Sequence, residues 1–441
     1  MPVLDLKQYI ESVAAADPMR VYGRVVEITG IIIRATGVKA SIGEACRIIS
    51  DSVELDAEVV GFRDGKVLLM AVGDLSDVKP GSRVLPIGKK VSVRVSSKLV
   101  GRVINDRGEP IDGKGPIVGV DYPLFSATPH PLKRRRITEP IDLGIRSING
   151  LLTCGKGQRV GIMAGTGVGK SVLLGMMARY TGASVNVIAL IGERGREVRE
   201  FIEKDLGEEG LKRSVIIVST SEQAPLAKVR GALAATAIAE YFRDQGEDVL
   251  LLMDSLTRVA MAQREIGLAT GEPPTSKGYT PSVFALLPKL LERVGTAEGK
   301  GSITGLYTVL VEGDDLSDPV ADAARAILDG HIVLSRELAM EGHYPAIDIL
   351  QSISRVMPDI VDPKHKELAS TFVETLAAYK KVEDMINLGA YKQGTNARVD
   401  YAITMIDKLR AYLRQGMQDR RDFGDSLQGL YFLFEHREAP V

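Results

Sequence analysis

A glycine-rich segment at residues 164–171 is the feature that most constrains the fold of this chain. An apolar run typical of a buried strand precedes it, at residues 159–163, and an apolar helix-forming run follows, at residues 172–180. Glycines in such a loop let successive backbone N–H groups turn inward at a helix N-terminus, which forms an anion-binding nest. This order of strand, loop and helix, with Gly-Lys-Ser at the end of the loop, predicts a phosphate-binding P-loop.

The positions of the loop have different expected parts in nucleotide binding. Lys170 is expected to reach the β- and γ-phosphates, and the hydroxyl of Ser171 is expected to bind Mg²⁺. The other positions are expected to surround the phosphates with backbone N–H groups. The first position of the loop is alanine in this chain, where the strict pattern has glycine. The full set is Ala164, Gly165, Thr166, Gly167, Val168, Gly169, Lys170 and Ser171.

The overall composition is that of a globular protein with an ample core. The chain has 441 residues, of which 45% are hydrophobic and 26% charged, and at roughly 100–200 residues per domain it should form two to four domains. Its net charge of −1 argues against an obligate nucleic-acid binder. Cys46 and Cys154 lack metal-ligand spacing and are expected to be reduced, buried thiols. Because the sequence shows neither a signal peptide nor a membrane span, we expect a cytoplasmic protein.

Four regions follow one another along the chain. Residues 1–19 have apolar side chains at helical spacing and predict a short helix that either packs on its own domain or binds a partner. Residues 20–85 alternate β-branched runs with glycine turns, which predicts a small β-barrel. Residues 86–362 hold the P-loop among continuous apolar runs suited to a parallel sheet, and residues 363–441 carry helical stripes. We expect an α/β, RecA-like P-loop NTPase core with an N-terminal β-barrel and a C-terminal helical domain.

Two carboxylates follow apolar runs that should form strands of the same sheet. Asp254 ends the run 248–254, and Glu193 comes just after the run 185–191. Because parallel strands end at the same edge of a sheet, both side chains should lie beside the P-loop. Asp254 would bind Mg²⁺ there, and Glu193 would orient and polarise an attacking water. The alternatives are that Asp254 caps the next helix and that Glu193 belongs to a charged surface segment.

Further motifs resemble those of the catalytic subunit of rotary ATP synthases. They are Gly-Glu-Arg at 192–194, Asp-Asp-Leu-Ser-Asp-Pro at 314–319, Tyr-Pro-Ala-Ile-Asp at 344–348 and Ser-Ile-Ser-Arg at 352–355. The chain is still more similar to the related type III secretion ATPases, specifically the flagellar protein-export ATPases. This closer resemblance is carried by residues 164–180, 192–198, 271–281 and 388–391.

The resemblance implies roles for individual residues. Glu193 corresponds to the water-activating glutamate of the family, and Arg194 and Arg258 correspond to its active-site arginines. Tyr344 corresponds to the aromatic residue that stacks on adenine, and Arg355 to an arginine finger that reaches the γ-phosphate on the neighbouring subunit. An arginine finger of this kind contributes roughly 10³–10⁵ in rate. The implied activity is therefore ATP hydrolysis that depends on assembly.

The resemblance also implies ligands and partners. ATP and Mg²⁺ are the implied ligands, and a homohexameric ring is the implied assembly. The implied partners are a stator-like regulator at the N-terminal helix, a central stalk protein, and export chaperone–substrate complexes. Peripheral association with the inner-membrane export apparatus is implied as well, and no nucleic acid is expected.

Other functions share parts of this pattern. A virulence-type (injectisome) secretion ATPase has the same chemistry. The catalytic subunit of ATP synthase carries an acidic catch loop, where this chain has residues 388–394 without a carboxylate. A hexameric RNA translocase needs stacking aromatics over a basic groove in its barrel, and residues 20–85 contain Tyr22 and Phe62 as their only aromatics. We therefore prefer a flagellar export ATPase.

Overall fold

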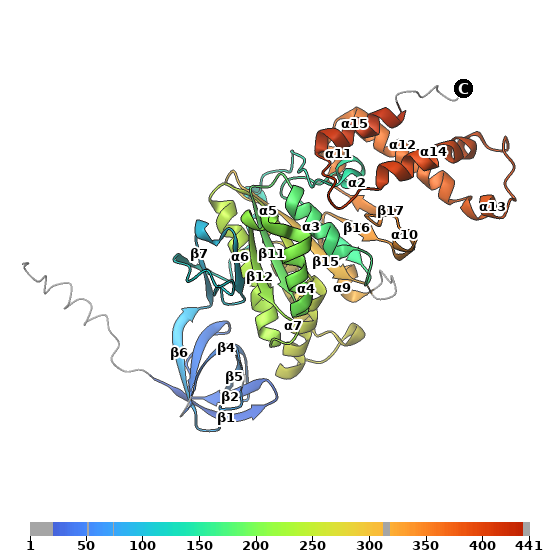
Figure 1. Ribbon diagram of the computed structural model, residues 1–441. Coiled ribbons are helices and arrows are strands. Elements are labelled where there is room, and N and C mark those ends of the chain that lie inside the picture. Colours follow the sequence, from blue (N-terminus) through green and yellow to red (C-terminus); the bar gives the residue numbers. More distant parts are fainter. Residues whose placement is uncertain (1–20, 51–52, 74, 312–317, 435–441) are drawn as a thin grey trace, which may run out of the picture. The chain divides into compact units, whose positions relative to one another are not determined.

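The computed structural model of the protein, shown in Figure 1, describes residues 21–50, 53–73, 75–311 and 318–434. The helix predicted at residues 1–19 and most of the motif at 314–319 lie outside the described residues. The chain divides into two compact units, one formed by residues up to 91 with residues 268–272, and the other by the remainder. In the described ranges, no helix combines the length and the apolar character that crossing a membrane requires.

The first unit is a closed barrel of antiparallel strands, as predicted. Its strands are β1 (Gly23–Thr29), β2 (Ile32–Thr36), β3 (Glu44–Ile49), β4 (Glu54–Arg63), β5 (Lys66–Ala71) and β6 (Arg83–Lys90), in the order β1-β2-β5-β4-β3-β6. Asp64 and Gly65 join β4 to β5 with φ angles of 51° and 71°, which is the geometry that a two-residue hairpin turn requires. Ile33, Ile48 and Leu69 are fully buried and fill the barrel.

The second unit contains a nine-stranded sheet in its described residues. The strands are β8 (Arg102–Asn105), β10 (Arg159–Ala164), β11 (Val185–Ile191), β12 (Ser214–Ser219), β13 (Asp248–Asp254), β14 (Gly295–Thr296), β15 (Ser302–Leu310), β16 (Gly330–Leu334) and β17 (Ile347–Ser354). The order is β17-β16-β10-β15-β13-β11-β12-β8, with β14 paired to β15. The apolar runs predicted as strands are therefore confirmed, and β10, which leads into the P-loop, lies inside the sheet. A separate two-stranded sheet pairs β7 (Ser92–Val95) with β9 (Val120–Pro123).

One edge of the large sheet differs from the parallel pattern. β17 runs antiparallel to β16 and was not among the predicted strands. Ile347 and Ile349 are buried, whereas Leu350, Gln351 and Ile353 are exposed, which is typical of an edge strand rather than of a strand covered on both faces. The reversal places the start of β17, rather than its end, level with the carboxyl end of β10.

Helices surround the sheet (Figure 1). They are α2 (Arg146–Leu151), α3 (Lys170–Tyr180), α4 (Gly195–Glu200), α5 (Gly207–Lys212), α6 (Pro225–Asp244), α7 (Leu256–Thr270), α8 (Pro281–Leu291), α9 (Pro319–Ile327) and α10 (Arg336–Met340). Pro225 is the first residue of α6, where its missing N–H costs no hydrogen bond, because the first N–H groups of a helix have no partner within it. The alanine-rich buried face of α6 packs on β11, β12 and β13.

The chain ends in a group of helices, as predicted. These are α11 (Met357–Ile360), α12 (Pro363–Lys380), α13 (Glu383–Asn387), α14 (Ala397–Leu413) and α15 (Phe423–Phe434). Asp362 and Asn396 cap the starts of α12 and α14, because their side chains accept hydrogen bonds from the first free backbone N–H groups. Phe372 and Tyr412 are buried between α12 and α14, with ring centroids 5.5 Å apart. The predicted apolar faces of these two helices therefore pack against each other. The predicted fold class is thus confirmed.

Candidate nucleotide-binding site

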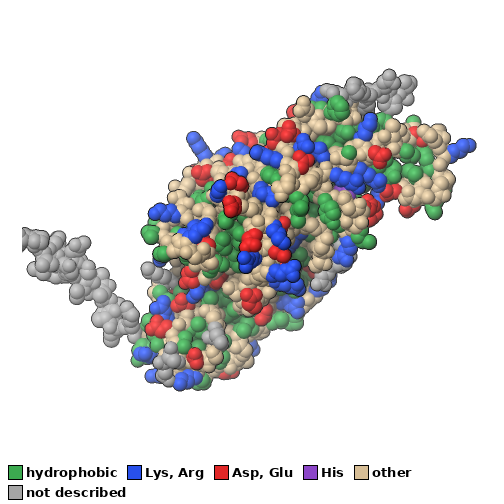
Figure 2. Space-filling view, viewed as in Figure 1, with side chains coloured by type: hydrophobic (Ala, Val, Ile, Leu, Met, Phe, Trp, Pro, Cys, Tyr) green, Lys and Arg blue, Asp and Glu red, His purple; other side chains and the backbone are tan. Residues whose placement is uncertain are grey.

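The predicted P-loop forms the expected turn between β10 and α3. Gly167 and Gly169 have φ angles of 78° and 86°, a region that residues with a Cβ rarely adopt, and α3 begins directly afterwards at Lys170. Val168 is buried and fixes the loop to the core, whereas Thr166 and Gly167 are exposed. The loop therefore presents backbone N–H groups to solvent at a helix N-terminus, which suits an anion. On the face shown in Figure 2, acidic and basic side chains are mixed, so the selectivity for phosphate has to come from this local geometry.

The two predicted carboxylates converge on the P-loop lysine. The Nζ atom of Lys170 lies 2.5 Å from Oδ1 of Asp254 and 3.6 Å from Oε1 of Glu193. The reason is the sheet register, because Leu190 on β11 pairs with Asp254 at the end of β13, so Glu193 leaves β11 at the same edge. All three charged groups are more than four-fifths buried. A buried lysine between two carboxylates is stabilised as a cation, and Asp254 and Glu193 outweigh burial to raise the pKa of Lys170.

The donor set around Asp254 fits a divalent cation. Its Oδ1 accepts hydrogen bonds from Lys170 and from Thr308 Oγ1, the latter at 2.7 Å, and among the described residues Oδ2 has no hydrogen-bond donor. Ser171 is exposed in the first turn of α3, so its hydroxyl is free to turn toward the loop. Carboxylate and hydroxyl oxygens are the ligands that Mg²⁺ prefers. Thr308 was not predicted, because it reaches Asp254 from β15 and belongs to no local motif.

Glu193 is an acid with an unusual environment. The pKa of its carboxyl group is raised to about 7, and burial is the largest cause. The nearby cation of Lys170 lowers this pKa, whereas the carboxylate of Asp254 and a hydrogen bond to Glu197 raise it further. A carboxyl group with a pKa near neutrality can both accept and release a proton at physiological pH. The position and the proton affinity of Glu193 therefore suit a general base.

The two predicted active-site arginines lie differently. Arg258, on α7, packs against the loop that carries Glu193, since a Cβ built at Gly192 would come within 2.8 Å of the Arg258 side chain. Glycine at position 192, with its φ of 75°, permits this close approach. The structure does not bring Arg194 to the P-loop, because its side chain is 81% exposed and pairs with Glu197 at 3.7 Å.

Tyr344 lies next to the P-loop on the segment between α10 and β17. A Cβ built at Gly169 would lie 3.4 Å from the Tyr344 ring, so the ring borders the end of the loop. The ring is half-exposed, and its hydroxyl donates to the carbonyl of Ala339 at 3.3 Å. An exposed aromatic face beside a phosphate-binding loop can stack on a nucleotide base.

Arg355 lies at the opposite edge of the sheet from the P-loop of its own chain. At one end of β17, Ile347 pairs with Leu334, which is level with the end of β10; at the other end, Ser354 pairs with Gly330. β17 bulges between Asp348 and Ile353, so its two ends are only as far apart as the ends of the five-residue β16, roughly 13 Å at about 3.3 Å per residue. Arg355 is exposed and donates to the carbonyl of Arg325 at 3.3 Å. It therefore lies away from the phosphate site of its own P-loop.

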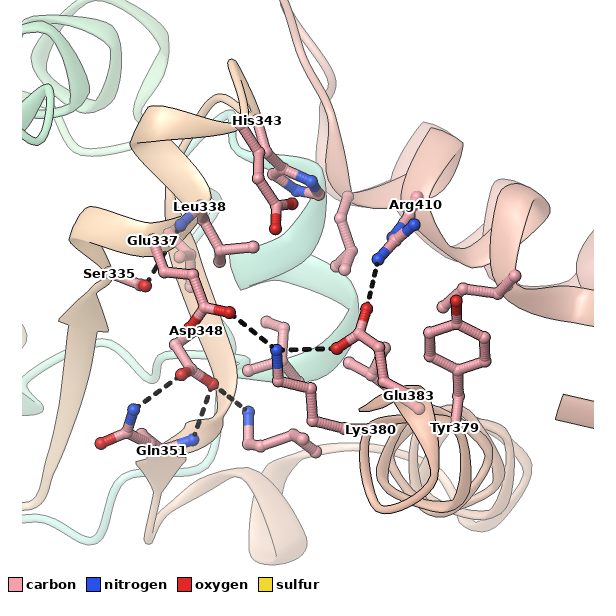
Figure 3. Close-up of a pocket in the computed structure, with 17 residues that line it drawn as sticks. Ser335, Glu337, Leu338, His343, Asp348, Gln351, Tyr379, Lys380, Glu383 and Arg410 are labelled. Atoms are coloured by element: carbon pink, nitrogen blue, oxygen red, sulfur yellow. Dashed lines mark hydrogen bonds and ion pairs between the residues drawn. The ribbon is translucent and has the colours of Figure 1, made fainter. Parts of the chain in front are cut away.

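A cavity of about 300 Å³ is lined by His343, the residue before Tyr344 (Figure 3). It is enclosed by α10, β17 and the helices α12 and α14, and it contains no P-loop residue. Lys380 spans it with ion pairs to Glu337 on α10 at 3.0 Å and to Glu383 at 2.9 Å. No motif predicted this cavity, because its walls come from segments far apart in the sequence.

Comparison with known proteins agrees with this geometry. Residues 144–354 match the nucleotide-binding domain and residues 25–88 the beta-barrel domain of the ATP synthase alpha/beta family, and residues 361–431 match the T3SS EscN ATPase C-terminal domain. The flagellum-specific ATP synthase of Pseudomonas aeruginosa is 53% identical, with 98% of each chain covered. The chain belongs to the ATP synthase alpha/beta family.

Similar relatives within that family carry flagellar or type III secretion names. The flagellum-specific ATP synthase of Bacillus subtilis is 51% identical over 97% of this chain and 99% of the relative, and the type 3 secretion system ATPase of Xanthomonas euvesicatoria is 50% identical over 93% of each. The structure of the assembled ATPase EscN from the type III secretion system of enteropathogenic E. coli superimposes with a TM-score of 0.87 at 44% identity, covering 93% of this chain and 99% of EscN. EscN in complex with its central stalk EscO gives a TM-score of 0.86.

Proposed function

We propose that this chain hydrolyses MgATP and that the reaction energises protein export through the flagellar type III secretion apparatus. The observation that carries the catalytic part is the convergence of Lys170, Glu193 and Asp254 at the open end of the P-loop. The export part rests on relatives named flagellum-specific ATP synthase at 48–53% identity. Relatives named type 3 secretion system ATPase are 48–50% identical, so they do not support the injectisome alternative better than the flagellar interpretation.

The chemistry follows from the positions of the side chains. The P-loop N–H groups and Lys170 bind the β- and γ-phosphates, while the ring of Tyr344 stacks on adenine. Glu193 orients a water molecule and accepts its proton as the water oxygen bonds to the γ-phosphorus and the bond to the bridging oxygen breaks. Asp254 and Ser171 would hold Mg²⁺, which neutralises phosphate charge when bound. In this scheme Lys170 exchanges its ion pair with Asp254 for the phosphates.

The arginines supply positive charge for the γ-phosphate. Arg258, on α7 and packed against the loop of Glu193, lies where it can stabilise negative charge that develops on the γ-phosphate. Arg194 would have to turn inward to take part. Arg355 acts on the P-loop of a neighbouring subunit, so the active site is shared across a head-to-tail interface of a homohexameric ring. A central stalk protein, a stator-like regulator, export chaperone–substrate complexes and a membrane-associated export apparatus are the proposed partners.

The rate per subunit should rise steeply with protein concentration if the active site is shared. We expect phosphate release per subunit to increase as rings assemble and then to level off. Mass photometry on the same samples reports the oligomeric state, and K170A serves as the inactive control at every concentration. A rate per subunit that stays constant while the protein changes from monomer to ring would contradict the shared site.

The pH dependence of kcat/KM should show an acid limb that belongs to Glu193. Glu193 acts as a base only when ionised, so with a pKa of about 7 in the free enzyme we expect kcat/KM to fall about tenfold per unit below pH 7. The limb should be absent from the residual activity of Glu193→Gln. Titration of Glu193 does not itself destabilise the fold along this limb: because its folded-state pKa is raised, Glu193 favours the folded state most below its usual pKa and loses this contribution as the pH rises toward 7. A flat profile between pH 5.5 and 8 would refute the assignment.

A further inference from the structure

Gln415 is a buried polar residue between the last helices and the Tyr344 segment. Its backbone N–H donates to the carbonyl of Tyr344 at 2.9 Å. Its side-chain Oε1 accepts from the backbone N–H of Arg146 at 2.8 Å. The Nε2 group donates to the carbonyls of Gly144 at 2.8 Å and Asp419 at 2.6 Å. The amide side chain thus fixes the backbone N–H that holds Tyr344.

Arg146 holds the end of α14, the helix that leads into Gln415. Arg146, the first residue of α2, donates to the carbonyls of Tyr412 and Ala411 at 2.6 and 3.0 Å and also to the carbonyl of Arg414. Carbonyls in the last turn of a helix have no partner within it, so this guanidinium caps the end of α14. It also lies over the Tyr412 ring, 5.2 Å from the centroid. Gln415 follows directly, so its position is set by α2 and α14 together.

The residues on either side of Tyr344 are held separately. The backbone N–H of His343 donates to the carbonyl of Leu338 at 2.9 Å, and the carbonyl of Ala346 accepts from the N–H of Ser335 at 2.8 Å. His343 lines the 300 Å³ cavity, and its Nε2 has no hydrogen-bond partner among the described residues (Figure 3). The hydroxyl of Tyr344 makes a longer bond, to Ala339 at 3.3 Å. The bond from Gln415 is therefore the shorter of the polar contacts that Tyr344 itself makes.

We propose that Gln415 is a positioning residue that sets the affinity for the nucleotide base by holding Tyr344 beside the P-loop. This inference rests on the proposed function, in which Tyr344 stacks on adenine. Gln415 touches neither phosphate nor base. Its loss should weaken binding of ATP, because the ring is less well placed, and leave binding of a bare polyphosphate unchanged, because the P-loop is intact. A KM that rises while kcat stays constant is the corresponding kinetic result.

A single fluorescent reporter tests the proposal. The chain contains no tryptophan, so Tyr344→Trp places one indole at the base site. In this parent we expect Gln415→Met to raise the Kd for MgATP about five- to tenfold, because the backbone N–H remains but loses the side-chain hydrogen bonds that hold it against the Tyr344 carbonyl. The Kd for magnesium tripolyphosphate, measured by calorimetry, should stay within twofold. In the chain with Tyr344 retained, KM for ATP should rise by the same factor with kcat within twofold.

His365→Met is the matched control. His365 is also buried and bonds α12 to α2, through the carbonyl of Gly150 at 2.7 Å, but it has no contact with Tyr344. It should lower the melting temperature while both Kd values stay unchanged. Equal losses of ATP and tripolyphosphate binding in Gln415→Met would show general damage and overturn the proposal. Should Gln415→Met not fold, Gln415→Asn retains the amide on a shorter arm and must show the same selective loss.

Failure of this inference and failure of the proposed function give different results. If the Tyr344→Trp parent does not respond to MgATP although calorimetry detects binding, Tyr344 is not at the base and both fall. If the parent responds and Gln415→Met binds ATP as tightly as the parent, the role of Gln415 is overturned and the proposed function stands.

Discussion

Glu193→Gln should lower turnover at least a hundredfold and leave MgATP binding nearly unchanged. The amide has the shape of the carboxyl group but cannot accept a proton from water, and loss of a general base costs typically 10²–10⁴ in rate. Binding should change little, because Lys170 and the P-loop N–H groups are intact. Phosphate release in a single turnover measures the chemical step, and calorimetry with MgATP measures the affinity.

Glu200→Gln is the matched control for this substitution. Glu200 lies on α4, seven residues along the same segment, and is an exposed partner of Arg196 and Lys204. Glu200→Gln makes the same change from carboxylate to amide outside the cluster of Lys170, Glu193 and Asp254. The turnover of this variant should match that of the wild type. Hydrolysis by Glu193→Gln rings within tenfold of the wild-type rate would remove Glu193 from the mechanism. Loss of binding together with turnover would instead give Glu193 a role in holding Lys170.

The central charges could be predicted because the information is local. The P-loop lies in a continuous stretch of sequence, and the rule that parallel strands end at one edge brings Glu193 and Asp254 to Lys170 without knowledge of the sheet order. The structure adds the register of β11 against β13 that makes the distances short. It also adds Thr308, which no local pattern could indicate because β15 pairs with β13 only after 47 residues of intervening chain.

The outer parts of the site could not be predicted from residue patterns. Tyr344 and Arg355 were identified only through the resemblance to a known family, because their places depend on β17 turning back along β16. The same reversal explains why one of them borders the P-loop and the other lies at the opposite edge. No sequence pattern could indicate Gln415, because its hydrogen bond to Tyr344 joins the backbone of both residues. Tertiary contacts between backbones leave no residue preference to detect.

Arg355→Ala should abolish turnover in homogeneous rings while P-loop binding of MgATP persists. The physical reason is the position of Arg355, which follows the end of β17 at the opposite edge of the sheet from the phosphate site of its own chain. If the guanidinium acts on a neighbour, its removal costs roughly 10³–10⁵ in rate. Arg398→Ala is the control, because Arg398 is exposed to a similar degree on α14 and pairs only weakly with Glu374 at 3.5 Å. Its turnover should stay within twofold of the wild type.

Mixing two inactive variants decides whether the arginine acts between subunits. Lys170→Ala chains cannot bind the phosphates productively but still carry Arg355, and Arg355→Ala chains have the opposite defect. In a head-to-tail ring assembled from equal amounts, about a quarter of the interfaces combine an intact P-loop with an intact arginine. We therefore expect activity to reappear on co-assembly and to vary with the mixing ratio, with its maximum near equal amounts. An arginine that acts within its own chain gives no such recovery, because each complete site would require both groups on one subunit.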